Sequence, residues 1–337
     1  MFLRLLIIAF LILSINLSGC SQNTRIPDNF DPHGKIVYIE DLSGKSGLTD
    51  FNFGDLVILD PETKEKIVLT RDRYYNAHPS WSPDGDKIVF ESKRVGAFTD
   101  ASTQSNLFIY HLNTGEIVRL DEDFKSRFPD IIEREFNQSP AWSNDGSRIA
   151  FVNRVGARGR IVIYYIEKDT LEIISDDIFF RKPLRWSSDD EYLLYGQRYT
   201  KAEPKSLFHP SVVILNIEEG NIREIGDSDW AYSMGNESNG RVYFTGQLID
   251  MIDSEYSAWY TYDIKNDTVS MVYESSNMLE ADVYVYGSKG YIINISPSNE
   301  NSFIRDIYRL DLSDFSAEQL TTDGHEKMDM DILRRKK

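Results

Sequence analysis

Two histidines are placed so that they could form one metal site or one general-base pair. His78 and His325 each stand just ahead of an expected strand, at matching positions of the sequence repeat described below. A pair of imidazoles at one place can hold a metal ion or act as a general base. No third ligand follows at a recognisable spacing, and the alternative is that each imidazole closes a loop hydrogen bond ahead of its strand. We therefore expect no metal site and no cofactor.

Aromatic and polar side chains gather in the same segments as these histidines. Exposed aromatic and arginine side chains are frequent anchors of binding interfaces. The residues that we expect to contact a ligand are Tyr74, Tyr75, His78, Phe136, Arg181, Trp230, Tyr232 and His325.

Signatures of catalysis are scarce in this chain. The sequence has no G-x-S-x-G nucleophile elbow, no phosphate-binding glycine loop, no H-E-x-x-H motif and no cysteine-based zinc site. Pairs such as Asp176-Asp177 are interpreted as turn residues, because a chain with 54 acidic residues contains such pairs by chance. We name no catalytic residue and expect a non-catalytic protein. The alternative is a hydrolase or lyase that acts on carbohydrate or peptide.

The only cysteine, Cys20, follows a segment typical of a secretory signal. Arg4 precedes an apolar run over residues 5–13, which is too short to span a bilayer. The segment ends in Leu-Ser-Gly-Cys, which resembles the bacterial lipoprotein signal box. The resemblance implies cleavage after residue 19, acylation of Cys20 and a place in the cell envelope. Ser21 then points to the outer membrane of a two-membrane cell.

The charge of the chain limits its partners. The formal net charge is −17 at pH 7. Nucleic acid is excluded as a ligand, because binding phosphates requires clustered lysine and arginine. A polar or cationic partner is expected instead. The basic run over residues 334–337 is interpreted as a solvated end.

A repeated pattern organises the middle of the chain. Residues 78–92 (HPSWSPDGDKIVFES), 139–153 and 183–197 each place a tryptophan before a tight polar turn and an alternating strand. In the first copy, Pro83 presets φ, Asp84 can bond its own backbone and Gly85 accepts a positive φ, which predicts a hairpin. The repeat residues are Trp81, Asp84, Gly85, Trp142, Asp145, Gly146 and Trp186.

This pattern resembles the WD-like repeats of TolB-type β-propellers, over residues 35–337. The resemblance implies that the repeated tryptophans pack between neighbouring blades and are structural. TolB itself carries an additional α/β domain ahead of its propeller, for which the polar segment 20–34 leaves no room. We therefore carry over the fold and not the role of TolB.

The expected fold is all-β, a six-bladed propeller of four-stranded antiparallel blades. The strands at residues 35–40, 55–60 and 65–70 lack an inner strand ahead of them, and residues 327–332 form an orphan strand after the last blade. The C-terminal strand is therefore expected to close the ring by completing blade one. The expected domains are a signal peptide (1–19), a lipidated cysteine with a flexible tether (20–34) and the propeller (35–337).

The connections between the expected strands fall into two sets. Short turns gather on one face, and long loops, over residues 41–54, 94–104, 121–137, 198–210 and 247–256, gather on the other. Because function concentrates in long loops on rigid scaffolds, we expect the binding face at the long-loop rim and the channel mouth. The expected protein is an envelope lipoprotein, monomeric, whose propeller binds an envelope protein or a polysaccharide.

Overall fold

The computed structural model describes most of the expected propeller. The described residues are 26–27, 29–43, 54–72, 74–95, 104–134, 136–156, 158–178, 180–198, 210–226, 230–248, 257–275, 279–299 and 302–335. Cys20 and the expected signal segment lie outside them. Within the described residues, no helix combines the length and the apolar character needed to cross a bilayer.

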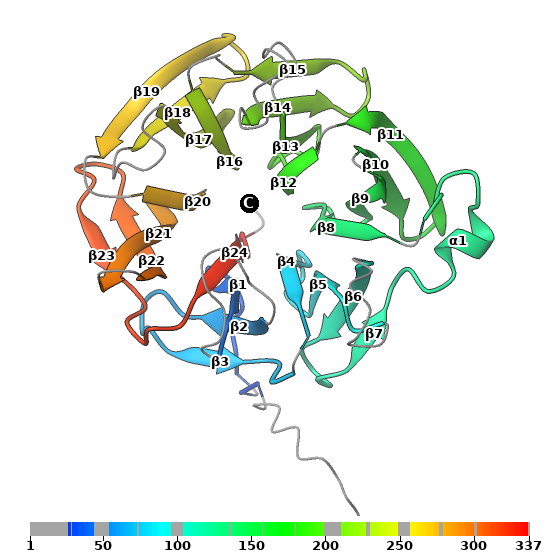
Figure 1. The fold of residues 1–337 in the computed structure, drawn as a ribbon, viewed down its shortest axis with the longest axis horizontal. Coiled ribbons are helices and arrows are strands. Elements are labelled where there is room, and N and C mark those ends of the chain that lie inside the picture. Colours follow the sequence, from blue (N-terminus) through cyan, green and yellow to red (C-terminus); the bar gives the residue numbers. More distant parts are fainter. Residues whose placement is uncertain are drawn as a thin grey trace, which may run out of the picture.

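Six four-stranded antiparallel sheets are arranged as blades around a central channel (Figure 1). Blade one contains, from the channel outwards, β24 (Lys327–Ile332), β1 (Ile36–Glu40), β2 (Asp55–Leu59) and β3 (Lys66–Val68). Blade two contains β4 (Asn76–Trp81), β5 (Lys87–Ser92), β6 (Asn106–His111) and β7 (Ile117–Arg119). Blade three contains β8 (Asn137–Trp142), β9 (Arg148–Val155), β10 (Arg158–Tyr165) and β11 (Thr170–Ile178).

The second half of the ring repeats this arrangement. Blade four contains β12 (Phe180–Trp186), β13 (Tyr192–Arg198), β14 (Pro210–Asn216) and β15 (Ile222–Ile225). Blade five contains β16 (Trp230–Ser238), β17 (Arg241–Leu248), β18 (Ser257–Asp263) and β19 (Thr268–Ser275). Blade six contains β20 (Leu279–Tyr286), β21 (Lys289–Asn299), β22 (Ser302–Asp311) and β23 (Ala317–Gln319). A short helix, α1 (Phe124–Arg127), was not expected and interrupts the link after blade two.

The C-terminal strand closes the ring, as predicted. β24 pairs antiparallel with β1, with Ile332 opposite Ile36 and Lys327 opposite Glu40. The pairing continues past the strands, because Gly34 N donates to Leu333 O at 2.9 Å. All five residues of β1 are buried, as is typical of a strand that is covered on both faces by neighbouring blades. The two ends of the described chain therefore hold one blade together.

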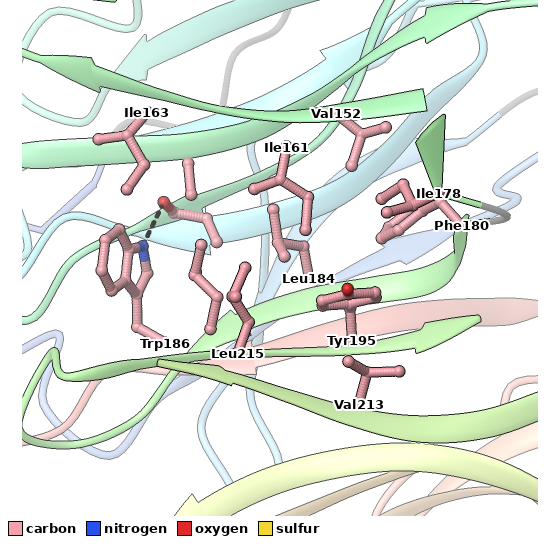
Figure 2. Packing of buried hydrophobic residues seen from close by; sticks show 13 residues of the cluster. Val152, Ile161, Ile163, Ile178, Phe180, Leu184, Trp186, Tyr195, Val213 and Leu215 are labelled. Atoms are coloured by element: carbon pink, nitrogen blue, oxygen red, sulfur yellow. Dashed lines mark hydrogen bonds between the residues drawn. The ribbon is translucent and has the colours of Figure 1, made fainter. Parts of the chain in front are cut away.

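The repeated tryptophans pack between blades, with one exception. Trp81 lies in a cluster with Val37 and Ile58 of blade one, and its side chain is 4% exposed. Trp186 packs among residues of blades three and four and donates from Nε1 to Ala141 O at 3.0 Å (Figure 2). Trp142 is only half-buried. In blade five, Glu237 stands opposite Val242 at the position of the repeated tryptophan, and Trp259 of β18 packs against blade six instead.

The weakest repeat copy keeps its turn with different residues. Gly85 and Gly146 adopt φ of +76° and +82° in the first two turns, as predicted. In the third turn, which has no glycine, Asp190 takes φ of +59°. Ser187 Oγ still donates to Asp189 Oδ1 at 2.5 Å and accepts from Tyr192 N at 2.9 Å. Side-chain hydrogen bonds therefore maintain the hairpin where the glycine is lost.

Part of the expected tether is packed against the propeller. Ile26 and Phe30 contact the cluster that contains Leu333, and Pro32 lies against Gly85. These contacts lie beside the Ser82–Asp86 turn and the turn at residues 113–115, on the face that carries the short turns. We call it the short-turn face and the opposite one the long-loop face.

Candidate functional site

A cavity of about 550 Å³ occupies the channel. Its walls include Pro83, Asn144 and Ser188, which belong to the first short turns of three blades, and the C-terminal Arg335. The cavity therefore lies at the short-turn end of the channel, which we call the channel cavity. Its volume is in the range of small-molecule and peptide sites, which are mostly about 300–1,000 Å³. Figure 1 shows β24, the last strand, at the inner edge of the ring.

One wall of the channel cavity is built by the sequence repeat. The inner strands of blades two, three and four each contribute a proline and the following tryptophan, at Pro79 and Trp81, Pro140 and Trp142, and Pro183 and Trp186. Trp81 and Trp186 are mostly covered by neighbouring blades, so the half-buried Trp142 offers the most aromatic surface to a ligand. This wall is apolar.

The opposite wall is charged and is crossed by Arg185. The Arg185 guanidinium extends from β12 to β20, where Nη2 donates to Asp282 Oδ1 at 3.0 Å and Oδ2 at 3.2 Å. It also donates to the backbone oxygens of Val283 and Met330, at 3.1 and 3.2 Å. The Tyr284 ring lies 5.2 Å from the guanidinium carbon. Arg185 thus ties blade four to blades six and one across the channel.

Two aspartates of β24 bind the neighbouring inner strand. Asp331 Oδ2 accepts from Trp81 N at 2.8 Å, and Asp329 Oδ2 accepts from His78 N at 3.0 Å. Asp329 Oδ1 lies 3.2 Å from His78 Nδ1. Ser80 occupies the corresponding place in blade two and accepts from Trp142 N at 3.0 Å. These carboxylates therefore act as links between blades.

Burial raises the pKa of two carboxyls in the channel. Burial raises the pKa of Asp282, and the charge and hydrogen bonds of Arg185 oppose this effect. Burial likewise raises the pKa of Asp331, against the hydrogen bond from Trp81 N. Tyr284 has its pKa raised to about 12, also chiefly by burial. Perturbed groups that converge on one cavity mark a candidate functional site.

The basic C-terminus is not simply a solvated end, which corrects that interpretation. Arg334 is half-buried, and it donates from Nη2 to Glu237 O at 2.8 Å and from Nε to Tyr284 Oη at 3.3 Å. Arg335 is exposed and pairs with Asp31 at 3.3 Å. The chain returns to the channel mouth after β24, so the first residues of this run line the cavity.

The charges of the channel cavity favour a cationic group. Its lining carries three arginines and a histidine against a larger set of aspartates, which are Asp145, Asp189, Asp190, Asp282, Asp329 and Asp331. Asp190 accepts from Asn144 N and Asp145 N, each at 2.8 Å. Asp145 and Asp189 are exposed beside it. Both carboxylates already accept hydrogen bonds within their own turns, Asp145 from Ser147 and Asp189 from Ser187, but their exposed oxygens have further lone pairs that can accept from a lysine or arginine of a partner.

The residues that we expected to form a binding rim lie at or near the starts of the inner strands of their blades. Tyr74 and Tyr75 lie half-buried just before β4, and their rings face Arg94 and Lys93, at 5.3 and 4.7 Å. Phe136 lies half-buried just before β8. Arg181, Trp230 and Tyr232 lie in β12 and β16, and their side chains are outside the described part of the structure. Most of the long loops at residues 41–54, 94–104, 198–210 and 247–256 also lie outside it.

The expected equivalence of His78 and His325 is wrong. His78 lies inside β4 at a bulge, with φ of +49°, and the residues with matching conformation in blades three and one are Ser139 and Asp329. His325 precedes β24, and its Nδ1 is 2.9 Å from Glu40 Oε1. His78 belongs to the channel and His325 to the seam between β1 and β24. The error arose from matching the two histidines by residue type: both inner strands carry the same bulge, and the counterpart of His78 is Asp329, four positions after His325.

The seam around His325 contains a group of possible metal ligands. Glu40, Asp323 and His325 each bring one ligand atom within 4.8 Å of the others. Lys66 donates to both oxygens of Glu40 and to Asp323, and Lys327 donates to Asp323 Oδ1 at 2.7 Å. Two ammonium groups therefore already neutralise these carboxylates. The arrangement is that of an ion-pair network that holds the two chain ends.

Four residues of the channel cavity were not predicted from the sequence as site residues: Arg185, Asp282, Tyr284 and Arg334. Arg185 could have been noticed, because it directly precedes the repeated Trp186, at the position of Ser80 and Ala141. The alternation of Asp329 and Asp331 along the orphan strand was a second signal, because alternate residues of a strand face the same side. Asp282 and Tyr284 have no local motif that marks them.

No protein-family model matches this chain, and no curated protein matches it. Solved structures do resemble it in fold. TolB from Acinetobacter baumannii superposes with a TM-score of 0.66 and 14% identity, over 92% of this chain and 69% of that one. The putative TolB from Agrobacterium tumefaciens superposes with a TM-score of 0.59 and 13% identity, over 83% of this chain and 90% of that one.

Propellers of proteases also resemble this fold. The β-propeller domain of the Trilobed protease from Pyrococcus furiosus superposes with a TM-score of 0.52 and 14% identity, over 87% of this chain and 96% of that one. That domain is described as having an open velcro topology, whereas β24 pairs with β1 here. At these identities the comparisons establish a TolB-like propeller fold and nothing further.

Proposed function

We propose that the protein is a lipoprotein of the cell envelope, anchored through acylated Cys20, whose propeller binds a protein or a polysaccharide without catalysis. The signal box ending at Cys20 supports the anchor. The likeness to TolB propellers supports the binding module. An outer-membrane position is part of the proposal, because Ser21 follows the cysteine.

The channel cavity carries this proposal. It is concave, of ligand size and lined by an apolar wall and a charged wall. Its buried carboxylates are occupied by backbone amides and by Arg185, as the bonds of Asp331 and Asp282 illustrate. A general acid or base needs an oxygen that can reach the substrate. Because the carboxylates of Asp282 and Asp331 are engaged in contacts between blades, the cavity is better suited to binding a ligand than to transferring a proton to it.

The excess of aspartates at the cavity mouth selects among ligands. A polypeptide segment that presents a lysine or arginine can bond to Asp145 and Asp189 while its apolar part contacts Trp142. An acidic polysaccharide would meet repulsion there. We therefore favour a protein ligand with a basic, extended segment.

The binding proposal is tested by recovering the partner with the intact lipoprotein. The mature protein is used as bait on detergent-solubilised membranes, and bound proteins are identified by mass spectrometry. Trp142→Ala combined with Asp189→Asn should reduce capture of the partner at least tenfold, while circular dichroism shows an unchanged fold. The matched variant carries Tyr74→Ala, Tyr75→Ala and Trp230→Ala at the expected rim. If only the rim variant loses the partner, binding occurs on the long-loop face and the channel proposal is wrong.

The anchor is tested separately. Wild-type protein should incorporate labelled fatty acid, and Cys20→Ala should yield an unlabelled precursor. An unlabelled mature wild-type protein would refute the anchor and leave the binding test unaffected.

Enzymatic activity on peptide or carbohydrate is the second candidate. The observation that favours it is the convergence of Asp282 and Asp331, both with raised pKa, on one cavity. Incubation with mixed peptide and glycan substrates checks this candidate. Product formation that is lost in Asp331→Asn would establish it, because the amide keeps an acceptor for Trp81 N but cannot exchange a proton.

A further inference from the structure

The segment that leads into the propeller is fixed on the short-turn face. Ile26 and Phe30 contact the cluster of Tyr110, Leu112 and Leu333. Residues 26, 27 and 30–33 line a hollow together with the Asp84–Asp86 turn and the turn at residues 113–115. All of these partners belong to the short-turn side of blade two or to the end of β24.

Hydrogen bonds and one close packing contact hold this segment in place. Gly34 N donates to Leu333 O at 2.9 Å, Lys35 N to Pro32 O at 3.1 Å, and Phe30 N to Pro27 O at 3.0 Å. Pro32 lies so close to Gly85 that a Cβ added there would be 2.3 Å from its Cγ. The segment is therefore a strap on the short-turn face, which we define as residues 26–27 and 29–34.

The reach of the chain limits where a lipid on Cys20 can lie. Five residues separate Cys20 from Ile26, and the six steps of an extended chain between them cover at most about 3.5 Å each, or about 21 Å in total. The inner strand β4 has six residues and spans about 20 Å between the two faces. To place the bilayer against the long-loop face, the whole linker would have to run fully extended along the outside of a blade.

From these distances we infer that the propeller stands on the membrane with its short-turn face toward the lipid surface. This inference rests on the lipidation of Cys20 in the proposed function. The strap keeps the short-turn face close to the lipid anchor, and the long-loop face points away from the bilayer. The partner of the short-turn face is the lipid surface itself.

This orientation has two physical consequences. The channel cavity opens toward the membrane, so a ligand reaches it from the gap between propeller and lipid. The exposed turn residues around the mouth are acidic, as at Asp84, Asp145 and Asp189. They repel anionic headgroups, so the gap should be wider over anionic vesicles at low salt and narrower at high salt.

The orientation is tested with a reporter on each face. Acylation blocks Cys20, so a cysteine introduced elsewhere is the only free thiol. Thr114→Cys lies in a short turn of blade two and Glu122→Cys in the long-loop link of the same blade, and both positions are exposed. Each is labelled with a fluorophore, and the acylated protein is reconstituted in phosphatidylcholine vesicles that contain lipids with nitroxide headgroups.

We expect at least threefold stronger quenching at position 114 than at position 122. Phe30→Gly combined with Ile26→Gly loosens the strap and should bring the two values closer together. Equal quenching in the unmodified strap, or stronger quenching at position 122, overturns the orientation.

A second arm separates this inference from the proposed lipid anchor. The mature chain with Cys20→Ser and a hexahistidine tag ahead of residue 20 is attached to nickel-chelating vesicles, and the two reporters are compared again. If the native protein fails to float with vesicles but the tagged protein shows the expected ratio, the lipidation proposal is wrong and the strap geometry is right. If both arms show no difference between faces, the strap does not orient the propeller.

Discussion

Arg185 of β12 spans the channel and pairs with Asp282 of β20, with 3.0 Å between Nη2 and Oδ1. Blade four is thereby tied to blade six without passing through blade five. The pair is nearly buried, with side-chain exposures of 10% and 12%. Asp282 also accepts from Met330 N at 3.2 Å, so the same contact holds the closing strand.

Removal of the arginine should strongly destabilise the propeller. Arg185→Leu leaves the Asp282 carboxylate buried without its cation, which costs about 3–5 kcal/mol of unfolding free energy. Urea unfolding followed by circular dichroism measures the loss. Arg127→Ala is the control, because Arg127 forms solvent-exposed ion pairs, which contribute little to stability. A loss below about 1 kcal/mol in Arg185→Leu would show that the Arg185–Asp282 pair does not stabilise the propeller. The double variant Arg185→Leu with Asp282→Leu should recover much of the lost stability, because it leaves no buried unpaired carboxylate.

Deletion of residues 327–337 should open the ring. The truncation removes β24 and exposes an edge of β1 that is otherwise fully buried. It also removes Lys327, whose buried ammonium bonds to Asp323 Oδ1 at 2.7 Å and to His325 O at 2.5 Å. We expect a clear fall in the thermal midpoint and a rise in aggregation. The control is a deletion of residues 336–337 alone; a truncated protein as stable as the full chain would rule out this closure.

Substitutions of two repeated tryptophans should have different effects, one mainly on stability and the other mainly on ligand binding. Trp81→Ala removes a buried side chain, at a cost of about 3–5 kcal/mol. Trp142→Ala should cost less, because its ring is half-buried, and should weaken ligand binding at the channel cavity. Chemical unfolding and pull-down on the same two variants provide the comparison. Equal losses of stability would assign Trp142 to packing and remove it from the site.

The architecture could be predicted from the sequence because its signals are local. The tryptophan and turn of residues 81–85 specify a hairpin within a few positions, and the orphan strand at residues 327–332 identified the closure. The alternation of apolar residues in strands such as β5 indicated the sheet core.

The candidate site was not predicted, because its residues meet only through the closed ring. Arg185 and Asp282 are 97 positions apart in the sequence, and no local sequence feature near either residue indicates that they pair. Matching His78 to His325 by residue type shifted the alignment of the inner strands by four positions, so Asp329 was overlooked as the counterpart of His78. Loop length indicated the opposite face, whereas the cavity depends on the short turns and the C-terminal arginines.

Gly85 should be required for the strap as well as for its turn. Alanine at this position must adopt φ of +76°, and its Cβ would lie 2.3 Å from Pro32 Cγ and 2.9 Å from Leu333 Cδ2. Gly220→Ala is the matched control, because Gly220 has φ of +67° with open space around it. Both variants should lose about 1 kcal/mol from backbone strain, and Gly85→Ala should lose more and make the strap susceptible to limited proteolysis. Equal stability and equal cleavage would show that the strap does not depend on this contact.

The raised pKa of Asp55 should make the stability of the protein depend on pH. Burial raises the pKa of this carboxyl from 3.8 to about 6, although Asp72 N donates to Oδ1 at 2.9 Å and Thr70 Oγ1 donates to it at 3.1 Å. The folded protein therefore holds this proton more tightly than the unfolded chain does. The stabilisation that protonated Asp55 contributes to the free energy of unfolding is fully present below about pH 4. It is lost as the pH rises through about 6, and its size is roughly 2–3 kcal/mol.

Asp55→Asn should flatten the stability curve over this window, because the amide keeps the Oδ1 acceptor and does not titrate. Thermal unfolding of both proteins from pH 4 to pH 7 measures the effect. Asp60→Asn serves as the control of opposite sign: burial alone would raise the pKa of Asp60, but the hydrogen bonds from Lys35 and from the Glu62 N–H lower it. Asp60 therefore stabilises the fold above about pH 4, and its loss should not flatten the decline from pH 4 to 6. If Asp55→Asn follows the wild-type curve throughout, then Asp55 is ionised in the folded protein at low pH and its burial has little effect on stability.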